Sequence, residues 1–309
     1  MWILVTLLAT VMLHPAHGGP LSHYPHLESA RPHDRVLIVA PHIDDESIGA
    51  GGYAIDAIAD GAEVYVVFMT AGDCNRFSAR LMYKTLDPTA ATYLSVGRAR
   101  ITEAQQAMQL LGVPREHYFI LGYPDRGLRT MLEHPAAVVR SRGTHFETVP
   151  YGDALSPGSE YNLESLLSDL RHVIRTVNPT QVIAPVPFDQ HPDHAATAEL
   201  VDRALAGTSC HPQRLGYLIH TSRIPTALVN TPARALLPPL RMRTYSWETY
   251  TLSPAVQQKK TKLLMVYRSQ RPYVFLLRNA FVRRNELFFI PQEPATLATT
   301  LPPAAPVSR

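Results

Sequence analysis

The sequence predicts an α/β fold with a mostly parallel sheet and helices on both faces. From residue 35 onward, short apolar runs alternate with amphipathic segments, the pattern of successive βαβ units. The chain of 309 residues is long enough for a sizeable core, and its 46% hydrophobic and 18% charged residues are ordinary for a globular protein. In such sheets, ligands bind beyond the carboxyl ends of the strands, so we expect the functional residues there.

Each candidate strand is a short run rich in β-branched, aliphatic or aromatic residues. The first, RVLIVA at residues 35–40, is continuously apolar, as expected of a strand that is covered on both faces. The later runs have the same character, and no internal repeat relates them. In chain order, the predicted strands cover residues 35–40, 63–70, 117–123, 181–186 and 214–220.

The candidate helices carry recognisable start and stop signals. These signals include acids in a first turn, an asparagine or serine cap, an early proline and glycine or proline stops. The predicted helices cover residues 46–59, 97–112, 162–179, 191–207 and 253–270. Two polar stretches, residues 72–90 and 124–161, are predicted to be loops that form pocket walls, with one short helix in the second.

The two ends of the chain differ from the rest. Residues 1–18 resemble an export signal, because an uncharged apolar run at residues 3–13 precedes Ala16 and Gly18 at cleavage spacing. We therefore expect an exported protein, periplasmic or secreted, with an uncleaved anchor as the alternative. A single domain is predicted over residues 19–290, followed by a disordered Pro-rich tail over residues 291–309.

Charge and cysteine content limit the classes of partner. The net charge of +3 comes without a continuous basic tract, so nucleic acid is not expected as a partner. No later segment is apolar enough to span a bilayer, and nothing indicates an oligomeric state. The two cysteines, Cys74 and Cys210, either pair in an oxidising compartment or stay separate, and they are too few for a thiolate zinc site.

Two polar clusters directly follow candidate strands. PHIDDE (residues 41–46) follows the first strand, and DQHPDH (residues 189–194) follows the fourth. Because the carboxyl ends of parallel strands share one edge of a sheet, we expect the two clusters to lie together. Together they supply the candidate ligands and acid–base groups, namely His42, Asp44, Asp45, His191, Asp193 and His194.

The residue types in these clusters suit catalytic zinc. Such a site uses three nitrogen or oxygen ligands and keeps a fourth position open for water. Zinc lowers the pKa of that water and polarises a carbonyl, and a neighbouring carboxylate accepts the proton. Because Asp44 and Asp45 are adjacent, their side chains point in different directions, so one can bind metal while the other faces the water.

Simpler explanations exist for each cluster taken alone. The acids at residues 44–46 could cap a helix, and HPDH could be an exposed helix start with a proline at its first position. A cap, however, requires neither the preceding histidine nor a matching cluster on another strand. The glycines at residues 49–52 do not form GxGxxG and fit close helix–strand packing better than nucleotide binding, and the chain has no GxSxG.

PHIDDESIGAGG together with HPDH resembles the LmbE-like (PIG-L) family of zinc-dependent N-deacetylases. TAGD, RITEAQQAMQLLGV, LGYPDRGL and KLLMVYRSQ follow in the family's order, and the resemblance covers residues 35–270. One departure is Ile43, where the family usually has proline; it supplies no ligand, although the turn is expected to be less rigid.

The resemblance implies a Rossmann-like sheet, a Zn²⁺ cofactor and removal of an N-acetyl group from a glucosamine-containing sugar or glycoconjugate. It implies that His42, Asp45 and His194 bind the metal, and that Asp44 is the general base. His191 would stabilise the oxyanion or donate a proton to it, with Asp193 orienting its ring. Arg100 and Asp125 match positions associated with substrate.

Three alternatives stay open. The substrate could carry another acyl amide or an ester, and the scaffold could be a non-catalytic carbohydrate-binding protein. Another divalent transition metal could replace zinc, because geometry and availability decide which ion is loaded. The sequence does not distinguish a polymeric substrate from a small molecule.

Overall fold

A computed structural model describes residues 21–221, 232–270, 276 and 278–291. It contains a seven-stranded sheet with the order β3-β2-β1-β4-β5-β7-β6. Strands β1 to β5 run parallel, whereas β7 runs antiparallel to both of its neighbours. In chain order the strands are β1 (Arg35–Ala40), β2 (Glu63–Thr70), β3 (Tyr118–Tyr123), β4 (Gln181–Pro185), β5 (Gln213–Tyr217), β6 (Trp247–Thr251) and β7 (Asn285–Phe289).

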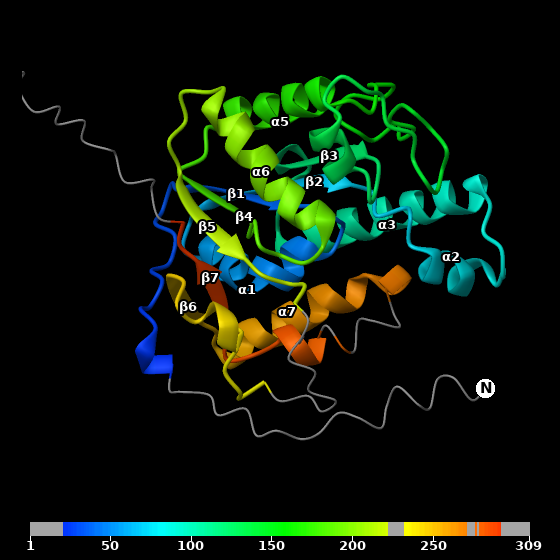
Figure 1. The fold of residues 1–309 in the computed structure, drawn as a ribbon. Helices are drawn as coiled ribbons and strands as arrows, with labels where there is room; N and C mark the ends of the chain where they lie inside the picture. The colour runs from blue at the N-terminus through cyan, green and yellow to red at the C-terminus, as the bar shows by residue number, and fades with distance from the viewer. Residues whose placement is uncertain (1–20, 222–231, 271–275, 277, 292–309) are drawn as a thin grey trace, which may run out of the picture.

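Helices cover both faces of the sheet, which confirms the predicted α/β fold (Figure 1). Helices α1 and α7 lie on one face, and α5 and α6 on the other (Figure 1). The helices are α1 (Asp45–Ala59), α2 (Arg76–Tyr83), α3 (Ala90–Leu111), α4 (Leu128–Glu133), α5 (Leu163–Val177), α6 (Pro192–Ala206) and α7 (Pro254–Val266), and the short 3-10 turns are η1 (Leu21–His23), η2 (Arg115–His117), η3 (Leu240–Met242) and η4 (Arg268–Gln270).

The capping signals in the sequence act at the helix ends as expected. The Asn162 side chain accepts a hydrogen bond from the backbone N–H of Ser165 at the start of α5, and Ser253 does the same for Val256 in α7. Gly112 ends α3 in the left-handed conformation. These side-chain and backbone contacts satisfy groups that a helix end would otherwise leave unpaired.

The glycines of α1 allow close packing, as the sequence suggested. A Cβ added at Gly49 would lie 2.6 Å from the Tyr217 ring on β5, and one at Gly52 would lie 2.5 Å from the Leu252 side chain. Larger residues would push α1 away from the sheet. Because β1 leads directly into α1, this packing fixes the position of the PHIDDE cluster.

Some sequence-based predictions were incomplete, and others lie outside the described residues. The stretch 72–90 contains α2, and α3 begins at Ala90, earlier than predicted. Strands β6 and β7 were missed. Cys74 and Cys210 are both free thiols. The signal segment 1–18 and nearly all of the tail 291–309 are outside the described ranges, so export and tail disorder stay predictions. No helix in the described ranges is long and apolar enough to cross a membrane.

A buried ion pair joins α1, α7 and β7. Lys260 Nζ lies 2.6 Å from Glu286 Oε1 and donates a 2.9 Å hydrogen bond to the Ile48 carbonyl. The Glu286 carboxylate also accepts hydrogen bonds from the backbone N–H groups of Gly52 and Tyr53, at 2.7 and 2.8 Å. Both side chains are fully or almost fully buried. The pair therefore fixes the middle of α1 to two other elements.

We predict that Lys260→Met lowers the free energy of unfolding by about 3–5 kcal/mol, because it leaves the Glu286 carboxylate buried without its cation. Lys260→Met/Glu286→Gln should recover part of this loss, since no buried charge remains. Lys262→Met, an exposed position on the same helix, is the matched control. Urea denaturation measures all three, and equal stability of Lys260→Met and the control would contradict the prediction.

Candidate metal centre

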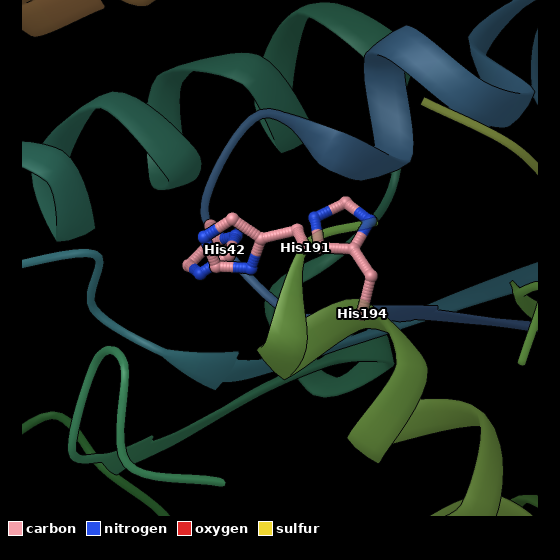
Figure 2. Close-up of side chains that lie close together, drawn as sticks. All are labelled: His42, His191 and His194. Carbon is pink, nitrogen blue, oxygen red and sulfur yellow. The ribbon is translucent and has the colours of Figure 1, made fainter. Parts of the chain in front are cut away.

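The two polar clusters meet where the strand order reverses. Strands β1 and β4 are neighbours, although β1 is connected through α1 to β2 on its other side. Such a reversal opens a crevice at the carboxyl ends of the strands. Figure 2 shows His42, from the β1–α1 loop, close to His191 and His194 at the start of α6. The ring centroid of His42 lies 4.7 Å from that of His191 and 5.3 Å from that of His194.

Donor atoms of the three predicted ligands converge. Asp45 Oδ2 lies 3.2 Å from His42 Nδ1 and 3.1 Å from His194 Nε2. Ligand atoms held about 2.1 Å from a tetrahedral metal are about 3.4 Å apart, so these distances suit one small cation. Three candidate ligand groups occur among the described residues, and each contains one or two of the predicted ligands: His42, His191 and His194; Asp45, His194 and His220; and His42, Asp125 and Asp193.

His194 is the most deeply buried of these ligands. Its side chain is fully buried, and neither ring nitrogen forms a hydrogen bond to any described residue, although Asp45 and Asp189 oxygens lie 3.1 and 3.3 Å away. Nearby carboxylates raise the pKa of His194 to about 9 against the opposing effect of burial. A buried ring nitrogen without a hydrogen bond, facing a carboxylate, fits a metal ligand.

His42 is surrounded by carboxylates. Its Nε2 lies 3.3 Å from Asp193 Oδ2 and 3.4 Å from Asp125 Oδ1, and its Nδ1 faces Asp45. Although burial opposes the change, these acids raise the pKa of His42 well above its usual value. The histidines in turn hold the pKa of Asp45 well below its usual range against the effect of burial. This excess of buried negative charge favours a bound cation.

Asp44 does not act as a helix cap. It occupies the N-cap position of α1, but its side chain makes no capping hydrogen bond, and its backbone has φ 121°. A non-glycine residue is strained at this φ, and strain of this kind is concentrated at functional sites. The capping explanation for the adjacent acids therefore fails at this residue.

Two side chains hold the Asp44 turn in place. Glu46 Oε2 accepts the Asp44 N–H at 3.2 Å, and Tyr267 donates a hydrogen bond to the other Glu46 oxygen. Arg100 donates to the Ile43 carbonyl, and its Nη2 lies 3.4 Å from Asp44 Oδ1. Ile43 is fully buried, so this residue contributes apolar packing and a carbonyl that binds Arg100.

Burial raises the pKa of Asp44 to about 8, and the Arg100 guanidinium opposes that rise. A carboxyl with a raised pKa is a stronger base than an exposed aspartate. The arginine predicted to contact substrate is buried against this turn, with Nη1 3.2 Å from the Gly72 carbonyl. Arg100 therefore fixes the Asp44 turn, and its substrate role stays a prediction.

Asp193 contacts the His191 ring through its backbone. The Asp193 backbone N–H, not its carboxylate, donates to His191 Nδ1 at 3.2 Å. The carboxylate instead contacts His42 and accepts backbone N–H groups of Arg126 and Leu128, at 2.6 and 3.2 Å. Burial and the neighbouring histidines lower the pKa of His191 to about 4. A neutral ring that accepts at Nδ1 carries its proton on Nε2, so that atom can donate a hydrogen bond.

Asp125 lies beside His42 and not in open solvent. Its Oδ2 accepts the Cys74 N–H at 2.8 Å, and its Oδ1 lies 3.4 Å from His42 Nε2. His42, with Arg100 and the Cys74 amide, holds the pKa of Asp125 at about 2 against the effect of burial. Its carboxylate is therefore placed to orient His42, the predicted metal ligand, and its predicted contact with substrate stays a prediction.

Two residues of the site were missed. Asp189 Oδ2 lies 3.3 Å from His194 Nδ1 and accepts the N–H groups of Ile219 and His220, while its Oδ1 accepts the His191 N–H at 2.9 Å. The His220 ring centroid lies 4.6 Å from that of His194. Asp189 is part of the DQHPDH cluster, and His220 follows the last parallel strand, so position on the sheet edge was the signal available for both.

Comparison with solved structures establishes the shared fold. The chain matches a deacetylase of teicoplanin biosynthesis, crystallised as the "deacetylase-bog complex", with a TM-score of 0.53 and 20% identity over 82% of this chain and 96% of the other. It also matches the 4-carboxy-2-hydroxymuconate hydratase of Pseudomonas putida KT2440, with a TM-score of 0.51 and 16% identity over 88% of this chain and all of the other. Because the fold carries both reactions, it does not by itself identify the chemistry.

Relatives found by sequence indicate the family more specifically than the fold does. A 1D-myo-inositol 2-acetamido-2-deoxy-alpha-D-glucopyranoside deacetylase of Kribbella flavida is 30% identical over 222 residues, 69% of this chain and 68% of the relative. A probable N-acetyl-alpha-D-glucosaminyl L-malate deacetylase 2 of Bacillus anthracis is 29% identical over 172 residues, 55% of this chain and 59% of the relative. The family model described as "PIG-L: GlcNAc-PI de-N-acetylase" matches residues 37–205, more than half of the chain. The chain therefore belongs to the PIG-L family.

Proposed function

We propose that this protein is a metal-dependent hydrolase that removes the N-acetyl group from a glucosamine-containing sugar or glycoconjugate. The observation that carries the proposal is the position of Asp44, which is a buried, non-capping carboxylate in a strained turn beside the converging donors of His42, Asp45 and His194. The deacetylase names of the relatives from Kribbella flavida and Bacillus anthracis support the reaction class.

The donor set fits Zn²⁺. His42, Asp45 and His194 would hold it, and two nitrogens with one carboxylate are a known catalytic set that leaves a position open. When bound, zinc lowers the pKa of a coordinated water and polarises the acyl carbonyl. The same donors also suit other divalent transition metals.

The residues of the chain divide the remaining work. Asp44 accepts the proton of the attacking water at its carboxylate; Arg100 lies beside that carboxylate, and Glu46 holds the Asp44 backbone N–H. His191 donates a hydrogen bond from Nε2 to the developing oxyanion, because its Nδ1 already accepts the Asp193 N–H. The water oxygen bonds to the acyl carbon, the amide C–N bond breaks, and the proton taken up by Asp44 passes to the leaving nitrogen, so that the products are acetate and the free amine of the sugar.

A panel of N-acetyl, N-butyryl and O-acetyl glucosaminides, assayed for released acid and free amine, tests the proposal. We expect the fastest release from the N-acetyl compounds. Faster release from the N-butyryl or O-acetyl compounds would assign another acyl amide or an ester as the substrate. No release from any compound, with glycan binding retained and no metal bound, would identify a carbohydrate-binding protein instead.

Asp189→Asn is predicted to weaken metal affinity about 10–100-fold, because carboxylates that orient a ligand histidine have effects of this size. The asparagine keeps an oxygen for the backbone N–H groups but removes the charge beside His194. Competition with a chromogenic chelator measures the affinity, and Asp87→Asn, whose side chain is 97% exposed, is the control. If Asp189→Asn binds metal with unchanged affinity, Asp189 does not contribute to metal binding.

A further inference from the structure

A cavity of about 290 Å³ lies beside the metal centre, on the side of the β3–α4 loop. Asp125, whose other face contacts His42, is one of its lining residues. The volume is at the small end for ligand sites, which suits a substituent of a few heavy atoms. The cavity can therefore receive a group attached to a sugar whose N-acetyl group is at the metal centre.

Three arginines line this cavity, namely Arg126, Arg140 and Arg142. Among the described residues, no carboxylate oxygen lies within ion-pair distance of any of their guanidinium groups. Elsewhere, Arg203 has Glu199 at 2.7 Å and the half-buried Arg214 has Asp202 at 2.5 Å, whereas the exposed Arg98 and Arg241 have no such partner among the described residues. The cavity thus gathers unpaired positive charge beside the metal centre.

The cavity wall holds these arginines in defined places. Arg126 has φ 63°, a conformation that costs a non-glycine residue free energy, and its backbone N–H is fixed by Asp193 Oδ2 at 2.6 Å. Arg140 Nε donates to the His145 carbonyl at 3.1 Å, which restricts that side chain. Arg126 thus occupies a backbone position at which glycine would be unstrained.

The one acid of the lining, Asp125, forms no ion pair with these three arginines. Both Asp125 oxygens are occupied, by the Cys74 N–H and by the His42 ring. The lining therefore carries three cationic side chains against one acid, which is an excess of positive charge.

We infer that this cavity binds an anionic group, a carboxylate or a phosphate, carried by the aglycone of the substrate. The inference rests on the proposed deacetylase function, because that function places the sugar at the metal centre. Guanidinium groups bind both anions through paired, charge-assisted hydrogen bonds. The preferred substrate is thus an acidic N-acetylglucosaminide and not a neutral one.

Three N-acetyl-α-D-glucosaminides of similar size test the inference, with carboxymethyl, 2-phosphoethyl and 2-hydroxyethyl aglycones. We expect kcat/KM for at least one acidic compound to exceed that of the hydroxyethyl compound by about 100-fold, mainly through KM, since charge-assisted hydrogen bonds contribute binding energy. If only one acidic compound is preferred, that compound shows whether the cavity binds a carboxylate or a phosphate. Equal kcat/KM for all three would overturn the inference.

The triple variant Arg126→Gln/Arg140→Gln/Arg142→Gln should lose this preference and keep its activity on the hydroxyethyl compound. The control Lys84→Gln/Arg241→Gln/Lys262→Gln has the same change in net charge at exposed positions outside the cavity, so it should keep the preference. A preference that survives in the cavity variant, or disappears in the control, would contradict the assigned site.

A binding measurement separates this inference from the proposed function. Calorimetry with the three corresponding free-amine glycosides requires no turnover, and it should show tighter binding of an acidic compound by the wild type but not by the cavity variant. If no N-acetyl compound is hydrolysed, the proposed function fails, while this binding difference still decides the anion site. Equal binding of acidic and neutral amines would overturn the site even in an active enzyme.

Discussion

Asp44→Asn is expected to lower kcat by about 10²–10⁴-fold while the metal content stays that of the wild type. The amide has nearly the same shape as the carboxylate but cannot accept the proton of the attacking water. The substituted side chain is not one of the converging donors, so the proposed metal ligands His42, Asp45 and His194 are unchanged. Single-turnover acetate release and elemental analysis on one sample measure both quantities.

The neighbouring Asp45→Asn variant is the matched control for Asp44→Asn. The same chemical change at the adjacent position removes the carboxylate that lies 3.2 and 3.1 Å from the two ligand histidines, so it should lower metal content as well as turnover. The pair of variants separates a base from a ligand. Full activity of Asp44→Asn would contradict the role of general base that is proposed for this residue.

His42→Ala is expected to abolish metal binding at stoichiometric concentration, and turnover with it. The substitution removes one of the three proposed ligands and also leaves the acids Asp45, Asp125 and Asp193 without the ring between them. Metal content after dialysis is the direct measurement. His172→Ala, an exposed histidine on α5, should retain both metal and activity.

A loss of fold in His42→Ala would also remove metal, so its thermal unfolding is measured beside that of the wild type. Because metal binding stabilises the folded state, the wild type should lose thermal stability on chelation, whereas His42→Ala should show no such shift. A stability of His42→Ala that still depends on the metal would show that the ion is held by other residues.

The parallel strands were predictable because burial on both faces makes them uniformly apolar. Strands β1 and β2 have the predicted boundaries, and their side chains fill the core. Strand β7 was missed because it carries Asn285 and Glu286, which read as loop residues. Glu286 tolerates burial only through its pairing with Lys260, a contact that local sequence does not reveal.

The start of α3 and the whole of α2 were not predicted, because local sequence does not reveal them either. Helix α3 begins at a capping box formed by Thr89 and Thr92, in which threonine replaces the usual glutamate or glutamine. The eight residues of α2 lie in a polar stretch whose exposed side chains give no core pattern. Such elements depend on tertiary contacts more than on periodicity.

The site itself was predictable to the level of the two clusters, since strand order placed both on one edge of the sheet. The contacts within it were not. Whether Asp193 reaches His191 through its carboxylate or its backbone depends on the loop after β3, whose amides bind that carboxylate. His220 and Asp189 likewise join the site through chain segments that meet only in the fold.

The most direct test of the account is the metal content and acetate release of one wild-type sample, measured before chelation, after chelation and after return of Zn²⁺. We predict about one ion per chain in the untreated protein, loss of acetate release with loss of the ion, and recovery of both together. Acetate release from an N-acetylglucosaminide that continues after complete removal of the metal would contradict the account.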